Sequence, residues 1–437
     1  MRLHLEYINK IKEADIQLNG LTVIAGENDT GKSTVGKVLF SIVKALSNAL
    51  NYDEEQKNNA VNKNVTSVYR RLNGLTVRKN NEIEISRDLF PRSSMEFYRN
   101  LLDADDQRLF IASRRTYIDS LDIAPRQKAL LNQDLDNIEI CMTKDSNPAA
   151  VLRQEMQSFI EAEFLNHICT TDCDQESKLE FFSDLEDKVV EAALANDTVK
   201  SVKCYNSIDG GWKDATYVES PLYIHLIDVL STSLTFREVE QKQRFLRPMV
   251  PLHIKDLAQK IDAIRYVNLG QLSLFKDDTL FDMDKLTGGH FVYDSKTRGV
   301  YWKKNGVLYS PVNVASGIKA FGIVQILLET HAIDENKLLL WDEPENHLHP
   351  QWQIAFAQLL VELAKAGISI VVSSHSPYFI QGIRYFAAKT SMEKYVNYYL
   401  AEEVDTNLVE MQNVSDDLNR VFTKLAQPMN SIMNLED

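Results

Sequence analysis

The chain lacks long hydrophobic runs and contains few cysteines. None of its apolar segments approaches the roughly 18 residues that a membrane-spanning helix needs. The opening MRLHLEYI alternates like a strand instead of pairing a basic region with an apolar one. We therefore expect a cytoplasmic protein with no membrane segment of its own. Four cysteines among 437 residues are too few for a disulfide framework, so we expect a large hydrophobic core.

The sequence also has no dense basic stretch and no sustained heptad pattern. Its 48 basic and 62 acidic side chains give a net charge of −14, which disfavours indiscriminate coating of nucleic acid because phosphates repel an acidic surface. A local nucleic-acid contact remains an alternative, with Arg70-Arg71, Arg78-Lys79 and the segment 236–247 as its candidates. Without heptads, we do not expect a long coiled coil. Length suggests roughly two or three domain-sized units.

The segment Gly26–Thr34, with the sequence GENDTGKST, predicts nucleotide binding. It follows the apolar run Leu21–Ala25 and precedes a helical pattern over Val35–Leu50. In such a strand, loop and helix, backbone N–H groups surround the β-phosphate, Lys32 reaches the β- and γ-phosphate oxygens, and the Ser33 hydroxyl coordinates Mg²⁺. We therefore expect the chain to bind ATP with Mg²⁺. The predicted phosphate-binding residues are Gly26, Asn28, Asp29, Thr30, Gly31, Lys32, Ser33 and Thr34.

Two later apolar segments end in residues suited to phosphate chemistry. Lys337–Trp341 reads as a buried strand and is followed by Asp342 and Glu343. Asp342 would complete the Mg²⁺ shell, and Glu343 would polarise the water that attacks the γ-phosphate. The strand 368–374 ends at His375, whose imidazole can exchange a hydrogen bond with the γ-phosphate or the attacking water. We predict Glu343, His375 and Lys32 as catalytic residues.

A Ser-Gly pair precedes a further predicted helix. Ser316 and Gly317 open the apolar segment 318–329, and we predict Ser316 as its N-cap. A helix start exposes free N–H groups and positive potential, so it attracts phosphate. An ordinary capped helix is the alternative. The pair resembles a degenerate form of the signature sequence of ABC-type ATPases, which in that family serves the nucleotide held by the opposite subunit.

The ordered set of motifs resembles an ABC-type ATPase head. The stretch DEPENHLHP, Asp342–Pro350, is similar to the RecF-, Rad50- and OLD-like branch of cytosolic AAA-family ATPases. That branch includes the ATPase subunits of bacterial phage-defence systems such as Septu, PARIS and Gabija. The resemblance covers roughly residues 1–50, 105–118 and 285–385. No glutamine loop or adenine-stacking aromatic residue can be placed from the sequence.

The resemblance implies an ATPase that works as a switch. Two heads would form a homodimer, or part of a higher homo-oligomer, on binding ATP, and hydrolysis would reopen them. A separately encoded effector, a nuclease or another toxin, would be the partner in bacterial antiviral defence. A RecF- or Rad50-type ATPase that clamps DNA is one alternative, which the acidic balance and the missing heptads disfavour. The cytosolic ATPase subunit of a transporter is another, which the degenerate signature and the long insertion disfavour.

The same patterns predict an α/β P-loop NTPase of the ABC-ATPase head type, with a mixed central sheet, flanking helices and a mainly helical insertion. We expect an N-terminal lobe at 1–120, the insertion at 121–265 and a C-terminal lobe at 266–437. Arg114 and Arg115 would lie at the ligand-binding edge of the sheet or in a surface ion pair. The predicted elements are two antiparallel strands before residue 25, a loop over 51–66, a strand over 108–112, helices over 151–164, 179–194, 222–230 and 254–264, a hairpin over 203–218, a meander over 290–312, and alternating helices and strands after residue 316.

Overall fold

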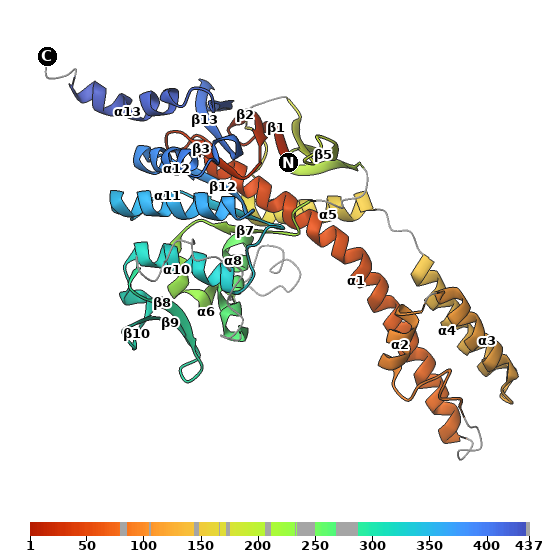
Figure 1. Ribbon diagram of the computed structural model, residues 1–437. Helices are drawn as coiled ribbons and strands as arrows, with labels where there is room; N and C mark the ends of the chain where they lie inside the picture. Colours follow the sequence, from red (N-terminus) through yellow and green to blue (C-terminus); the bar gives the residue numbers. More distant parts are fainter. Residues whose placement is uncertain are drawn as a thin grey trace. The chain divides into compact units, whose positions relative to one another are not determined.

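The chain divides into two compact units, a head and a helical unit (Figure 1). The computed structural model describes residues 1–78, 85–104, 106–143, 148–165, 167–171, 175–205, 211–231, 233, 250–267 and 287–433. The head comprises Met1–Asn48 and Leu152–Asp437, and the helical unit comprises Ala49–Val151. These bounds differ from the predicted insertion at 121–265. They differ because the strands between residues 177 and 218 pair into the sheet of the head.

The described part of the head contains an 11-stranded sheet in the order β6-β5-β4-β1-β2-β14-β13-β3-β12-β11-β7. The strands from β7 to β13 are parallel to one another, and those from β2 to β6 pair antiparallel. β14 joins the two parts, antiparallel to β13 and parallel to β2. The strands of this sheet are β1 (Arg2–Ile8), β2 (Ile11–Gln17), β3 (Leu21–Ala25), β4 (Ser177–Phe182), β5 (Lys188–Ala195), β6 (Thr198–Cys204), β7 (Asp214–Val218), β11 (Lys337–Asp342), β12 (Ser369–Ser374), β13 (Val396–Asp405) and β14 (Leu408–Asn413).

A second, three-stranded sheet and a set of helices complete the head. The small antiparallel sheet consists of β8 (His290–Asp294), β9 (Gly299–Lys304) and β10 (Val307–Tyr309). The helices are the start of α1 (Lys32–Arg78), most of α5 (Pro148–Phe164), η1 (Pro221–His225), α6 (Ile227–Leu230), α8 (Leu252–Asp262), η2 (Ala263–Tyr266), η3 (Pro311–Asn313), α10 (Ser316–Glu329), α11 (Pro350–Lys365), α12 (Pro377–Lys389), η4 (Glu393–Tyr395) and α13 (Asn419–Met433). Among the described helices, none combines the length and the apolar character that a membrane crossing requires.

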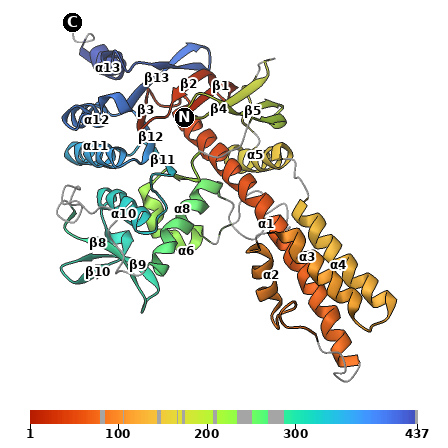
Figure 2. The ribbon, with the colours of Figure 1, turned by 45° about the vertical axis from the view of Figure 1, so that its right-hand side comes forward.

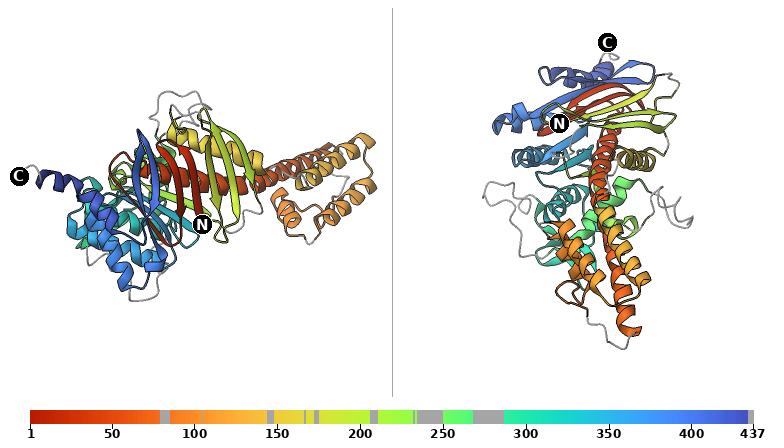
Figure 3. Two further views of the ribbon diagram at one scale, coloured as in Figure 1. Left: turned by 90° about the horizontal axis from the view of Figure 1, so that it is seen from above. Right: turned by 90° about the vertical axis from the view of Figure 1, so that its right-hand side faces the viewer.

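The parallel strands of the head are buried on both faces, as their continuous apolar sequences require. On one face, Leu339 and Val372 belong to the core that α10, α11 and α12 complete. On the other face, Ile24, Leu340 and Val371 lie next to the first turn of α1. In Figure 3, α1 and α5 lie along the strands of the antiparallel part. This arrangement confirms the predicted α/β P-loop fold with a mixed central sheet and flanking helices.

The helical unit packs around an aromatic core. Besides part of α1 it contains α2 (Ser94–Leu102), α3 (Gln107–Ser120) and α4 (Pro125–Thr143), and Figure 2 shows α3 and α4 alongside α1. The rings of Phe90 and Phe97 stack with 5.6 Å between centroids. Asp134 of α4 accepts hydrogen bonds from Ser67 at 3.0 Å and Arg71 at 2.6 Å on α1. Arg71, a candidate for nucleic-acid contact, is therefore already paired.

Several predicted elements are confirmed. β1 and β2 pair antiparallel with Leu5 opposite Ala14, and the helices predicted over 151–164 and 254–264 correspond to α5 and α8. The helix predicted over 222–230 is split between η1 and α6. β8, β9 and β10 form the predicted meander, and helices alternate with parallel strands from α10 to β12.

The predicted loop over 51–66 is wrong, because these residues continue α1. Val61, Val65, Val68 and Leu72 are all buried. Their spacing of four, three and four residues places them on one helix face. The many asparagines of this segment concealed that apolar stripe.

Three other predicted elements differ from the structure. The segment 108–112 lies in α3, which buries Ile111 and Ile118 seven residues apart, so it is not a strand. The predicted helix over 179–194 is the antiparallel pair β4–β5, with Phe181 opposite Val190. The predicted hairpin over 203–218 does not form, because β6 and β7 lie at opposite ends of the sheet. Buried and more exposed residues alternate along β4 and β5, so the segment did carry the two-residue period of a strand.

Candidate functional site

Four parallel strands bring the predicted motifs to one edge of the sheet. β12 lies between β3 and β11 and runs parallel to both, and β7 runs parallel to β11 on its other side. Their carboxyl ends therefore meet at the same edge, where ligands bind in open α/β sheets. The phosphate loop follows β3, Glu343 follows β11, and His375 follows β12. The loop at Gly26–Thr34 is thereby brought to the same edge as Glu343 and His375, which follow it by more than 300 positions.

The loop after β3 has backbone conformations that glycine favours. Gly31 has φ 75° and Asp29 has φ 65°, a left-handed conformation that favours glycine and tolerates aspartate. A Cβ at Gly26 would lie 2.9 Å from the Ala401 Cβ, which is too close for a side chain. α1 then begins at Lys32, so its first N–H groups face the loop.

Lys32 is buried within this loop. Its Nζ donates hydrogen bonds to the carbonyl oxygens of Gly26 at 3.1 Å and Glu27 at 2.5 Å. Burial lowers the pKa of Lys32, while the carboxylates of Glu343 and Asp342 act to raise it. An ammonium group among carboxylates and carbonyls at a helix start is suited to binding a phosphate.

The two predicted magnesium ligands line the same small cavity. Ser33 and Asp342 both face it, together with Lys32, Ser373 and Tyr217. The Ser373 hydroxyl donates a hydrogen bond to one Asp342 oxygen. No group of three or more acidic, His or Cys side chains suited to a metal occurs among the described residues. One carboxylate and one hydroxyl fit Mg²⁺, which takes few protein ligands and completes its shell with water and phosphate.

Glu343 and His375 lie next to each other at the end of β11 and β12. The Nδ1 atom of His375 lies 3.2 Å from Glu343 Oε1, and the Asn346 side chain donates to Glu343 Oε2 at 2.8 Å. Glu343 has φ 44°, a conformation that a non-glycine residue keeps only when its surroundings hold it. A carboxylate beside Nδ1 favours the proton on that nitrogen, which leaves Nε2 as the hydrogen-bonding atom for a ligand. Asn346, which the sequence reading did not single out, fixes the carboxylate.

β7 brings a further polar group to this edge, which the sequence reading missed. Glu219 follows β7, and its Oε2 lies 3.1 Å from His253 Nε2, while His253 Nδ1 lies 2.5 Å from Glu163 Oε2. Burial alone would lower the pKa of His253, but its contacts with both carboxylates raise it. The hydrogen bond with His253 lowers the pKa of Glu219 to about 2. Contacts with two carboxylates therefore hold the buried His253 ring, which orients Glu219 at the end of β7.

Tyr217, two residues earlier on β7, separates this group from the cavity. Its side chain is 2% exposed, and the ring lies 4.7 Å from the His253 ring, centroid to centroid. Burial and the nearby Asp342 carboxylate raise the pKa of Tyr217 well above its usual value. A Cβ at Gly36 of α1 would lie 3.0 Å from the Tyr217 ring. Tyr217 is therefore a neutral, tightly packed wall of the cavity.

Ser316 and Gly317 lie at the start of α10, as predicted, but Ser316 is not its N-cap. Ser316 already has helical geometry, so the N-cap is Ala315, which makes no side-chain capping bond. The Ser316 hydroxyl instead donates to the His347 carbonyl at 3.3 Å. A Cβ at Gly317 would lie 3.0 Å from the Leu348 side chain. The Ser-Gly pair therefore packs on the loop that follows the acidic pair.

The position predicted for Arg114 and Arg115 at the carboxyl end of a strand is wrong. Arg114 and Arg115 lie in the helical unit on α3 instead of following a strand. The Arg114 guanidinium lies 3.3 Å from the centre of the Phe110 ring. Arg115 pairs with Asp136 at 2.6 Å, which is the surface ion pair named as the alternative. Residues 79 and 236–247 lie outside the described part of the chain.

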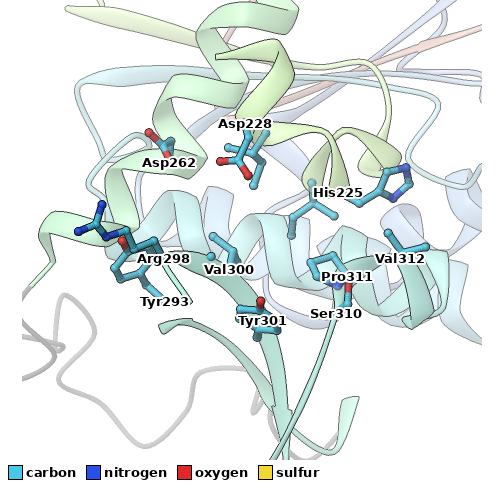
Figure 4. Close-up of a pocket in the computed structure, with 13 residues that line it drawn as sticks. His225, Asp228, Asp262, Tyr293, Arg298, Val300, Tyr301, Ser310, Pro311 and Val312 are labelled. Carbon is cyan, nitrogen blue, oxygen red and sulfur yellow. The ribbon is translucent and has the colours of Figure 1, made fainter. Parts of the chain in front are cut away.

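A second cavity of the head, about 170 Å³ in volume, lies between helices and the small sheet (Figure 4). Asp228 and Asp262 line it from the helical side, and Arg298 and Tyr301 line it from the side of β8 and β9. None of the predicted nucleotide-binding residues is among its described lining residues. This cavity is therefore separate from the one at the phosphate loop.

Comparison with known proteins identifies the family. A family model described as "AAA domain, putative AbiEii toxin, Type IV TA system" matches residues 50–381, which is more than half of the 437 residues. The chain belongs to this family. The match of the AAA domain spans Ser316, Asp342, Glu343 and His375 and begins after the phosphate loop. Among curated proteins, none matches the chain.

Three solved structures, all of SMC heads, are distantly similar to this AAA domain protein. An Smc head bound to the C-terminal winged-helix domain of ScpA has a TM-score of 0.39 and 12% identity, covering 94% of this chain and 97% of that one. The SMC head domain of Thermotoga maritima has a TM-score of 0.35 and 10% identity, covering 94% and 98%. An Smc head with an extended coiled coil, bound to the C-terminal domain of ScpA from Pyrococcus furiosus, has a TM-score of 0.34 and 12% identity, covering 98% and 99%.

Proposed function

We propose that the protein is an ABC-type switch ATPase that binds and hydrolyses ATP with Mg²⁺ between two copies of the chain. The observation that carries this proposal is the convergence of Lys32, Asp342, Glu343 and His375 at one edge of four parallel strands. A phosphate-binding loop, a carboxylate at a small cavity and a carboxylate–imidazole pair are the parts that triphosphate hydrolysis needs. Membership of an AAA domain family supports the same activity.

The chain's own residues divide the work of binding. Backbone N–H groups from Asn28 to Thr34 and the Lys32 ammonium would hold the β- and γ-phosphates. The Ser33 hydroxyl and the Asp342 carboxylate would hold Mg²⁺ at the cavity that both line. When bound, Mg²⁺ neutralises phosphate charge that develops during transfer. Tyr217 lines the same cavity, and its tightly packed ring would form a rigid wall against the bound nucleotide and Mg²⁺.

Hydrolysis would depend on the pair at the strand ends. Glu343 would orient the attacking water and accept its proton, because the Asn346 side chain holds one of its oxygens and the His375 ring lies beside the other. With its proton on Nδ1, the His375 imidazole would accept a hydrogen bond from that water at Nε2. Glu219 would be a third polar group at this edge, in the place where the sequence offered no glutamine loop.

The Ser316-Gly317 pair would complete the site of the partner subunit. Both residues lie at the first turn of α10, where free N–H groups and the helix dipole attract phosphate. They pack on the loop after Glu343 and are separate from the cavity that Lys32 and Ser33 line. This separation supports a composite site in which each chain caps the nucleotide of the other, in a dimer or a higher oligomer.

The biological role that we propose is control of a separately encoded effector, a nuclease or toxin, in bacterial antiviral defence. The description of the matched family, which names a toxin of the AbiEii type and a type IV TA system, supports a role in this area. A DNA clamp of the RecF or Rad50 type is less well supported. Arg71, one of its candidate contacts, is bound to Asp134.

Nucleotide titration and light scattering would test the proposal. Lys32→Ala should abolish ATP binding measured by calorimetry with Mg²⁺, because the loop loses its only side-chain cation, whereas Lys365→Ala at the exposed end of α11 should bind normally. The wild-type chain should release phosphate and should associate with ATP but not with ADP. Normal ATP affinity in Lys32→Ala, or hydrolysis by a chain that stays monomeric, would refute the proposal.

A further inference from the structure

Glu345 is a buried carboxylate within the stretch Asp342–Pro350, and no step of the proposed reaction uses it. It lies in the loop after the acidic pair and is 3% exposed. A buried carboxyl group is costly unless hydrogen bonds compensate it. An apolar side chain of similar volume, such as leucine or methionine, would fill the same space at less cost. The hydrogen-bond partners of the Glu345 carboxylate therefore indicate its structural role.

One oxygen of Glu345 holds the turn that carries His375. Oε1 accepts a hydrogen bond from the Ser374 hydroxyl at 2.6 Å, from the His375 backbone N–H at 2.8 Å and from the Ser376 backbone N–H at 3.1 Å. These N–H groups lie between the end of β12 and the start of α12, so neither can bond within a strand or helix. A carboxylate at the start of α12 also suits the helix dipole.

The same oxygen lies close to the His375 ring. Glu345 Oε1 is 3.6 Å from the His375 Nδ1 atom, which is itself 3.2 Å from Glu343 Oε1. Gln353 makes a second connection between the same two segments. The Ser376 hydroxyl donates to Gln353 Oε1 at 2.6 Å, and Gln353 Nε2 donates to the Leu348 carbonyl at 3.0 Å. The loop after β11 and the turn after β12 are thus fastened together by side chains.

We propose that Glu345 is the positioning residue that holds His375 beside Glu343. This role rests on the proposed ATPase function and adds a residue to it. Glu345 itself would touch neither ATP nor water. It would fix the backbone of the His375 turn, and through it the place of the imidazole ring, so that Nε2 points to the attacking water. Burial raises the pKa of the Glu345 carboxyl, and the hydrogen bonds from the Ser374 hydroxyl and the His375 backbone N–H oppose that rise.

Steady-state ATPase kinetics with paired variants would test this role. Displacement of a catalytic group by about 1 Å can cost about 100-fold in rate. Glu345→Ala should therefore lower kcat by about that factor while KM for ATP changes by less than about threefold. Glu345→Gln should recover most of the rate, because its amide oxygen can accept the same three hydrogen bonds. ATP-dependent association, which relies on Ser316, should persist in both variants.

A double mutant separates positioning from general stability. If Glu345 acts through His375, the variant Glu345→Ala/His375→Ala should be no slower than His375→Ala alone. Multiplied losses would overturn the proposal, as would wild-type kcat in Glu345→Ala. If Glu345→Ala does not fold, Ser374→Ala, which removes one donor to Oε1, should show a smaller loss with the same non-additivity. A wild-type chain that fails to hydrolyse ATP would refute the ATPase function and this role together, whereas an active wild type matched by Glu345→Ala refutes only the role of Glu345.

Discussion

Replacement of Glu343 by Gln offers the sharpest test of the reaction. The amide has nearly the shape of the carboxylate and can still accept the 2.8 Å hydrogen bond from Asn346. It cannot accept a proton from water. It also presents an N–H group to the His375 Nδ1 atom, which lies 3.2 Å from the carboxylate in the native chain. The change therefore removes basicity with little change in packing.

The expected loss follows from the role of a general base, which contributes about 10²–10⁴-fold to a rate, or about 3–5 kcal/mol of transition-state free energy. Glu343→Gln should bind ATP with nearly native affinity, because Lys32 and the loop are intact. It should also accumulate closed dimers with ATP and Mg²⁺, because opening follows hydrolysis.

Single-turnover phosphate release, followed by light scattering with ATP and with ADP, would measure both effects. Glu335→Gln, at an exposed glutamate on the loop before β11, is the matched control and should behave like the wild type. Unchanged phosphate release in Glu343→Gln would remove Glu343 as the base. Lost ATP binding would show that the carboxylate supports the phosphate loop instead of the reaction.

Three further predictions concern stability and assembly. Gly322→Ala should lower the free energy of unfolding in urea by about 2 kcal/mol or more, because its Cβ would lie 2.1 Å from the Phe291 ring in a closed core. Gly74→Ala on α1, where a Cβ meets nothing within 4 Å, should instead stabilise by about 0.4–1 kcal/mol, and equal effects would contradict the packing described. Because the pKa of His253 is raised in the folded chain, its stabilisation is complete below the unfolded pKa of about 6.5 and is lost as pH rises through the folded pKa. The unfolding free energy should thus fall as the pH rises above about 6.5, and His253→Gln should flatten that fall; an unchanged slope would mean that the imidazole is not charged. Ser316→Arg should leave ATP binding to the monomer intact and abolish ATP-dependent association in light scattering, and undiminished association would argue against a composite site.

The parts of the site that could be predicted from the sequence are those that local chemistry specifies. A glycine loop must follow a strand and open a helix, so Gly26–Thr34 predicted the fold class, and it also gave the place where phosphates are expected. Asp342 and His375 each end an apolar run, and parallel strands bring such ends together without any knowledge of strand order. The placement of Ser316 at the start of α10 followed from the same kind of pattern, although its hydroxyl bonds the His347 carbonyl instead of capping the helix.

The parts that sequence reasoning missed depend on pairings between distant segments. Glu219 belongs to the site only because β7 pairs with β11, with Tyr217 opposite Leu340. The starts of these two strands are 123 positions apart, so their contact leaves no local signal. The two glycines at 210 and 211 favoured a hairpin there. β7 instead joins the buried parallel sheet, where more of its apolar surface is removed from water and Tyr217 is 2% exposed. Glu345 could not be singled out for a similar reason, since its three donors lie 29 to 31 residues away on the next strand end. In a sequence, a charged residue such as Glu345 looks like any other. Once the fold buries it, the charged group needs hydrogen-bond partners, and those partners show which part of the structure it holds in place.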